Sequence, residues 1–83
     1  MESGTEVQLN TMTPGERGVV ARINVMGGAA RQRLMEMGLI KGTPVELIRV
    51  APMGDPIEVR IRGYRLSLRK LEAESVIVRK APH

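Results

Sequence analysis

The chain has 83 residues, so we expect one small domain over residues 1–83, with a single core between about 7 and 79. Its 42% hydrophobic and 27% charged residues are typical of a globular protein, and its net charge of +4 favours acidic or phosphate-bearing partners. The absence of cysteine excludes disulfides, thiolate metal sites and thiol nucleophiles.

The first elements are a lead-in segment and a strand. Residues 7–12 predict a short strand or turn ahead of Pro14 and Gly15, which favour a reversal of the chain. Residues 19–25 then alternate with period two, the pattern of a half-buried strand. One face carries Val19, Ala21, Ile23 and Val25, and the other carries Val20, Arg22 and Asn24.

A short helix is predicted next. Ala30, Leu34 and Met37 are spaced at i, i+4 and i+7, so they share one helical face. Gly38 is suited to the left-handed conformation that ends a helix, and Leu39 to packing back on the last turn. We therefore expect about ten helical residues that end at Gly38.

A strand with apolar residues on both faces follows the turn at residues 41–44, and we expect it to lie in the middle of the sheet. Two prolines mark residues 51–56 as an exposed loop. The strand places Val45, Leu47, Arg49 and Ala51 on one face and Glu46, Ile48 and Val50 on the other.

A hairpin is predicted around Gly63. The strand before it points Ile57, Val59 and Ile61 inward, and the strand after it points Tyr64, Leu66 and Leu68 inward. Residues 71–75 suit a single helical turn and residues 76–80 a last strand. The hairpin then directs four arginines outward as a basic face: Arg60, Arg62, Arg65 and Arg69.

About five strands at short intervals, with one short helix inserted after the first main strand, predict a mainly β fold. Closure of a small sheet protects its edges. The expected architecture is therefore an SH3-like small β-barrel. With one tyrosine and no Phe or Trp, its core must consist of Val, Ile, Leu, Met and Ala.

Residues that could perform catalysis do not form a set. His83 is the one histidine and stands at a terminus, while Ser67 and Ser75 lack a neighbouring base. Asp55 and Glu58 flank a proline, which favours turn formation and solvation over acid–base chemistry. We expect no enzymatic activity.

Metal and nucleotide sites are also not predicted. Fe²⁺ sites draw on imidazole and carboxylate groups, and the six methionines are better explained as gap-filling residues of a core without aromatics. The glycines at 27 and 28 lack the Lys-Ser/Thr ending of a P-loop. We expect no tightly bound cofactor.

Several motifs in one order give the chain a family resemblance. The stretches "RQRLMEMGLIKGT", "APMGDPIEVRIRGYRLSLR" and "EAESVIV", within residues 9–78, resemble the FeoA family of bacterial ferrous-iron uptake. The resemblance implies an SH3-like fold, similar also to the C-terminal domain of iron-dependent repressors. It implies a cytoplasmic accessory protein that binds and regulates FeoB, a membrane transporter with a GTPase domain, with Fe²⁺ as the transported ion.

Other sequence features fit this resemblance and leave one alternative open. No apolar run approaches the roughly 20 residues that span a bilayer, so we expect no membrane insertion. A basic nucleic-acid-binding or repressor-like module is the alternative, but it lacks the aromatic residues on which bases stack. We expect no nucleic-acid partner, and an exposed strand edge would permit weak self-association.

The expected partner surface combines the helix and its exit, the exposed loop and the basic face. Leu39 and Ile40 either form an apolar anchor there, or Leu39 caps the helix and Ile40 enters the core, which leaves no anchor. The arginines would meet an acidic patch and speed the encounter. The residues of this expected surface are Arg31, Leu39, Ile40, Lys41, Met53, Asp55, Arg60, Arg62, Arg65 and Arg69.

Overall fold

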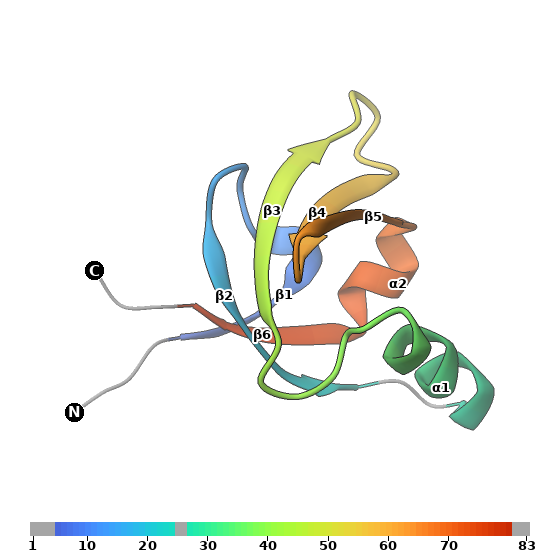
Figure 1. The fold of residues 1–83 in the computed structure, drawn as a ribbon. Coiled ribbons are helices and arrows are strands. Elements are labelled where there is room, and N and C mark those ends of the chain that lie inside the picture. Colours follow the sequence, from blue (N-terminus) through green and yellow to red (C-terminus); the bar gives the residue numbers. More distant parts are fainter. Residues whose placement is uncertain (1–4, 25–26, 81–83) are drawn as a thin grey trace.

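The computed structural model describes residues 5–24 and 27–80, so the expectations for Val25, Met26 and His83 lie outside the described residues. A single curved sheet has two helices at one end (Figure 1). The elements are β1 (Glu6–Gln8), the 3-10 helix η1 (Leu9–Thr11), β2 (Arg17–Ile23), α1 (Gly28–Glu36), β3 (Pro44–Val50), β4 (Ile57–Ile61), β5 (Tyr64–Leu68), α2 (Lys70–Glu74) and β6 (Val76–Lys80).

The sheet is antiparallel throughout, with the strand order β1-β6-β2-β3-β4-β5. The predicted mainly β fold is confirmed, as are the position of α1 after the first main strand and the central place of β3. The sheet has six strands where about five were expected, because the lead-in segment pairs with β6. It is also open, since β1 and β5 are its two edges.

A β-bulge in β2 changes the predicted alternation. Val20 pairs with Val78 and Arg22 with Ile77, so Ala21 is an extra residue on its strand. Val20 is 1% exposed and Val19 only half-buried, which reverses the faces expected for the first half of the strand. The bulge restores the expected phase, so that Ile23 is buried.

A second bulge lies in β3. Leu47 pairs with Val59 and Arg49 with Glu58, which leaves Ile48 as the extra residue. The expectation that Arg49 shares a face with Val45 and Leu47 is therefore wrong. Beyond the bulge Val50 packs against the core, and Arg49 is exposed.

The β4–β5 hairpin has the predicted reversal at Gly63. Ile61 pairs with Tyr64, so the loop consists of Arg62 and Gly63, with φ angles of +46° and +86°. Positive φ at both positions is typical of the type I′ turn, whose twist matches that of the flanking strands. Tyr64, predicted to point inward, is instead 46% exposed.

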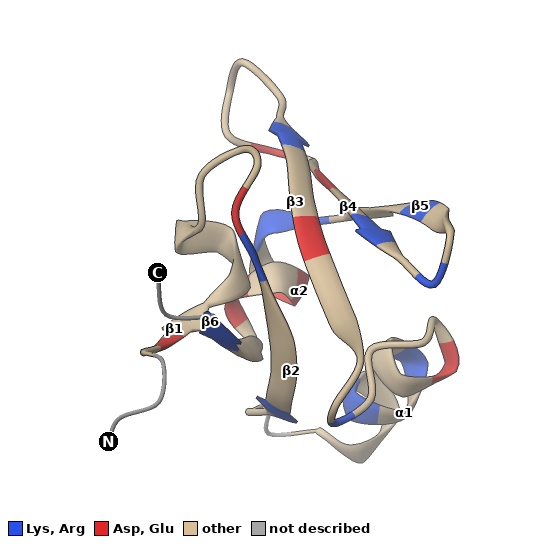
Figure 2. Cartoon of the chain, turned by 60° about the vertical axis from the view of Figure 1, so that its left-hand side comes forward, with Lys and Arg blue, Asp and Glu red and all other residues tan. Residues whose placement is uncertain are grey.

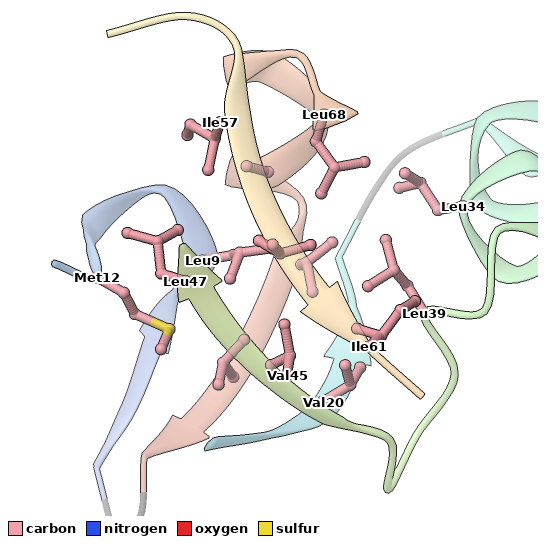
Figure 3. Close-up of a cluster of buried hydrophobic side chains, with 14 of the residues drawn as sticks. Leu9, Met12, Val20, Leu34, Leu39, Val45, Leu47, Ile57, Ile61 and Leu68 are labelled. Atoms are coloured by element: carbon pink, nitrogen blue, oxygen red, sulfur yellow. The ribbon is translucent and has the colours of Figure 1, made fainter. Parts of the chain in front are cut away.

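The core consists entirely of aliphatic residues and methionine, as the composition required (Figure 3). Leu39, at 0% exposure, lies in this core beside Ile61 and Val20, whereas Leu34 reaches it from α1. The cluster comprises Leu9, Met12, Val20, Ile23, Leu34, Leu39, Val45, Leu47, Ile57, Val59, Ile61, Leu68, Ala73, Val76 and Val78.

Helix α1 contributes less to the core than its spacing predicted. Leu34 is its buried residue, Met37 just after it is partly buried, and Ala30 is exposed. The helix has nine residues, and Gly38 follows it with φ +104°, which confirms the predicted end. The N–H of Leu39 donates to the carbonyl of Leu34 over 3.2 Å, so the chain turns directly from the helix into the core.

Candidate functional site

The described residues do not assemble a cluster of metal-ligating side chains. Within residues 5–24 and 27–80, no three His, Cys, Asp or Glu side chains are placed to hold a metal ion. The described methionines are dispersed: Met12 lies in the core and Met37 at its margin, whereas Met35 and Met53 are exposed. The gap-filling role predicted for methionine therefore does not apply to Met35 and Met53.

A groove of about 390 Å³ lies between α1 and α2. Ala30 and Leu34 from α1 and Leu71 from α2 supply its apolar lining, and Leu71 is 75% exposed. Charged and polar side chains complete the lining. We name it the α1–α2 groove; the residues that line it are Ala30, Arg33, Leu34, Leu71, Glu72, Glu74 and Ser75.

Contacts with the loop and with the core position α2. Oδ1 of Asp55 accepts a hydrogen bond from the backbone N–H of Lys70 over 3.0 Å, which joins the 51–56 loop to the start of the helix. Ala73 is completely buried, so the helix approaches the core through a small side chain. Leu71 precedes Ala73 by two residues, about 200° around a helix, and therefore projects away from the core.

An ion pair bridges the two helices beside this groove. Nη2 of Arg33 lies 3.0 Å from Oε2 of Glu72, whose side chain is 17% exposed. Oε1 of Glu72 accepts the backbone N–H of Arg69 over 2.9 Å, so both oxygens have partners. The ion pair thus fixes one side chain of each helix, Arg33 of α1 and Glu72 of α2. The apolar side chain of Leu71 stays accessible. Such an arrangement suits a protein contact with an apolar centre and a charged rim.

The helix exit differs from the surface that the sequence predicted. Leu39 is buried in the core, so it cannot present its side chain to a partner, whereas Ile40 is 39% exposed. The hydroxyl of Tyr64 donates to the carbonyl of Met37 over 2.7 Å and covers the end of α1. Ile40 therefore remains as the candidate anchor, and Tyr64 is a second exposed large side chain at the end of α1, in place of Leu39.

The predicted basic face is partly neutralised by glutamates. Arg60 lies 3.3 Å from Glu46, and Arg65 lies 4.0 Å from Glu58. Nη2 of Arg62 donates to the hydroxyl of Thr43 over a long 3.5 Å. These arginines are exposed, but the face has mixed charge rather than being uniformly basic.

The expected surface residues do not form one patch. Arg60, Arg62 and Arg65 lie together at the hairpin end, whereas Arg69 follows the opposite end of β5. Met53 is 91% exposed in the loop joined to α2. Ile40 and Lys41 follow α1 and Asp55 lies in the 51–56 loop, and all three are exposed. Arg31, near the start of α1, donates to the carbonyl of Ile23 over 3.1 Å.

Sequence reasoning missed Leu71 and Arg33. The small Ala73 gives the signal that could have identified Leu71, because a one-turn helix that packs through alanine exposes the residue two positions earlier. No local pattern shows that Arg33 reaches Glu72. That contact joins positions 39 residues apart in the chain (72 − 33).

Sequence and structure comparisons assign the family. Residues 7–80 match the model of the FeoA domain. A curated relative, the "Fe(2+) transport protein A/Fe(2+) transporter FeoB fusion protein" of Porphyromonas gingivalis, is 32% identical over 72 residues. The match covers 87% of this chain and 8% of that relative's length.

Solved structures agree in fold. A FeoA-like protein from Clostridium acetobutylicum has a TM-score of 0.84 and 38% identity, with 100% of this chain and 93% of that chain covered. Stenotrophomonas maltophilia FeoA, solved with zinc and described as an SH3 domain protein, has a TM-score of 0.76 and 29% identity, with 87% and 88% covered.

The expected likeness to metal-dependent repressors is also found. A manganese-dependent transcriptional repressor has a TM-score of 0.84 at 21% identity, over 90% of this chain and 36% of that chain, which is a likeness of fold alone.

None of the described helices is long and apolar enough to cross a membrane. With the family model matched over residues 7–80, the chain belongs to the FeoA family.

Proposed function

We propose that this protein is a non-enzymatic, cytoplasmic accessory protein of ferrous-iron uptake that binds and regulates a FeoB-type transporter. The observation that carries the proposal is the relative in which a FeoA unit and a FeoB transporter form one chain. Covalent linkage raises the effective concentration of two units for each other, which benefits units that act in contact. Fe²⁺ is the cargo of this system and needs no resident site on the accessory protein.

The α1–α2 groove is the proposed contact. Leu71 offers an apolar side chain that is already 75% exposed, so its burial by a partner gains free energy without opening the core. The Arg33–Glu72 pair holds the two helices together beside it, which limits the ordering cost of binding. Ile40 at the helix exit is a second, smaller anchor.

Binding to nucleic acid has less support from the same surfaces. Among the described residues, five cations are paired with carboxylates, including two of the four arginines of the predicted basic face. Tyr64 is the one aromatic residue, and its hydroxyl is bonded at the end of α1. Strand-binding proteins rely on stacking platforms and continuous positive grooves, which this combination does not supply.

A capture experiment with a detergent-purified FeoB-type transporter tests the proposal. Leu71→Asp is expected to weaken capture by at least about ten-fold, as for a central apolar contact. Met53→Asp adds the same charge at an even more exposed apolar residue outside the groove, so the comparison separates the groove from the 51–56 loop as the contact. GTP hydrolysis by the transporter, measured with and without the chain, reports regulation.

Each result of this experiment has a definite meaning. Failure of the unmodified chain to bind the transporter overturns the proposed function. Wild-type capture by a folded Leu71→Asp variant removes the groove from the contact, and the same test on Ile40→Asp decides the helix exit. Far-ultraviolet circular dichroism confirms that each variant is folded.

A further inference from the structure

A row of charged side chains crosses four strands on the outer face of the sheet. Arg17 of β2 pairs in register with Glu46 of β3, Glu46 with Arg60 of β4, and Arg60 with Arg65 of β5. Directly opposed residues project from the same face, so one glutamate stands among three arginines. Figure 2 shows the arginine segments of β2 and β4 on either side of the acidic segment of β3. We call these four residues the arginine row.

A hollow of about 210 Å³ adjoins this row. Arg17 and Arg60 line it together with Arg62 from the hairpin turn, and Pro44 adds an apolar surface. The long hydrogen bond from Arg62 to Thr43 brings its guanidinium toward the start of β3. Three guanidinium groups from three separate segments therefore border one small depression.

The charges around the hollow are not balanced within the described chain. Glu46 pairs with Arg60, whereas neither Arg17 nor Arg62 forms an ion pair with any described carboxylate. Two guanidinium forks are thus available beside an existing carboxylate–guanidinium pair. A guanidinium binds a carboxylate through two parallel hydrogen bonds, and it keeps its charge at any physiological pH.

We propose that the hollow and the arginine row bind the carboxylates of an acidic segment of a protein partner. A carboxylate placed between Arg17 and Arg62 would accept hydrogen bonds from both guanidinium groups, offset one of their two charges and extend the pairing that Glu46 and Arg60 already make. Pro44 would contact the methylene groups of the bound acidic side chain. This inference goes beyond the proposed function, because it assigns the chemistry that the arginine row recognises. It rests on the proposed function only where the acidic segment is assigned to the transporter.

Glu46 is the reason for preferring an acidic protein segment to a phosphate chain. Glu46 stands between Arg17 and Arg60 in the strand register. Because neighbouring strands are about 4.8 Å apart, the backbones at Arg17 and Arg60 are separated by about 10 Å. A nucleic acid presents regularly spaced phosphates that would meet this negative charge. A protein segment can place its carboxylates beside Arg17 and Arg62 and leave the position opposite Glu46 neutral or basic.

Titration of the ¹⁵N-labelled chain with a short oligoglutamate peptide tests this inference by nuclear magnetic resonance. Amide shifts are expected to cluster at residues 17–18, 45–46 and 60–63. The double variant Arg17→Gln with Arg62→Gln is expected to bind about ten-fold more weakly, since it removes the two unpaired guanidinium groups. Glu46→Gln is expected to bind more tightly, because it removes the like charge.

A charge-matched double variant, Arg49→Gln with Lys70→Gln, provides the control. Both side chains are exposed, neither lines the hollow, and their loss lowers the net charge by the same two units. Equal weakening by the two double variants, or no binding of the peptide, overturns the inference. Tighter binding of a thymidine oligonucleotide of equal charge at the same residues also overturns it. Because the transporter is absent from this titration, its outcome is independent of the capture experiment.

Discussion

The α1–α2 groove and the arginine row differ in the kind of group that they offer to a partner. The groove exposes an apolar side chain, Leu71, beside an ion pair that is already complete. The row exposes guanidinium groups, of which Arg17 has no partner among the described carboxylates. Apolar anchors supply most of the affinity of small interfaces, whereas exposed charges mainly set orientation and encounter rate.

The two regions also differ in how tightly the neighbouring chain is packed. At the end of α1, Leu39 enters the core and Gly38 lies against Tyr64. At the hairpin turn beside the arginine row, a Cβ atom added at Gly63 would meet nothing within 4 Å. The helical region therefore depends on close contact, and the sheet face depends on local backbone conformation.

The largest expected effect is at Leu39. Leu39→Ala is expected to lower the free energy of unfolding by about 2–4 kcal/mol, because it leaves a cavity at a fully buried site. Ile40→Ala, next to it but 39% exposed, is expected to cost less than about 1 kcal/mol. Urea denaturation followed by circular dichroism measures both. Equal losses of unfolding free energy would show that Leu39 and Ile40 contribute equally to the stability of the core.

Two glycines with similar backbone conformation provide the next comparison. At Gly38, with φ +104°, an added Cβ would lie 2.8 Å from the hydroxyl of Tyr64. Gly38→Ala should therefore cost about 2 kcal/mol, from the left-handed conformation and the lost Tyr64–Met37 hydrogen bond. Gly63→Ala, with φ +86° and open space, should cost about 1 kcal/mol.

The same denaturation measurement checks this pair. If Gly63→Ala cost as much as Gly38→Ala, close packing would not distinguish the helix exit from the hairpin turn. Tyr64→Phe keeps the ring and removes the hydroxyl. It therefore isolates the contribution of the Tyr64–Met37 hydrogen bond to the free energy of unfolding.

A smaller effect of opposite sign is expected at Arg62. Its φ of +46° is unfavourable for arginine, whereas the Asn-Gly sequence favours this type of turn. Arg62→Asn is therefore expected to raise the free energy of unfolding by about 0.5 kcal/mol. A lower stability would mean that the contact between Arg62 and Thr43 outweighs the backbone preference.

The smallest expected effect concerns pH. Nζ of Lys80 lies 2.8 Å from Oε2 of Glu16, and this hydrogen bond, with that from the N–H of Thr13, lowers the pKa of the Glu16 carboxyl. A carboxyl whose pKa is lower in the folded state stabilises the fold above its unfolded-state pKa. That stabilisation is lost as the pH falls through the lowered pKa of Glu16, which lies below the ordinary pKa of a glutamate carboxyl.

Glu16→Gln should therefore flatten the acid limb of stability against pH and leave the neutral region nearly unchanged. Thermal unfolding across the acid range measures this. An acid limb as steep as that of the unmodified chain would exclude Glu16 as a contributor.

Local sequence signals determined the elements whose form depends on neighbours in the chain. Period two identified the inward face of β4 as Ile57, Val59 and Ile61, all of which are buried. Gly38 and Gly63 marked the end of α1 and the hairpin turn, because both positions require positive φ. The scarcity of aromatic residues determined an aliphatic core.

The tertiary structure alone decided which faces and charges meet. The bulges at Ala21 and Ile48 arise from pairing with β6 and β4, and each shifts the inward set of its strand in a way that period two cannot reveal. The register of three strands likewise places Arg17 and Arg60 beside Glu46. Local chemistry determines single elements, whereas contacts between residues distant in the chain depend on how the sheet is paired and curved.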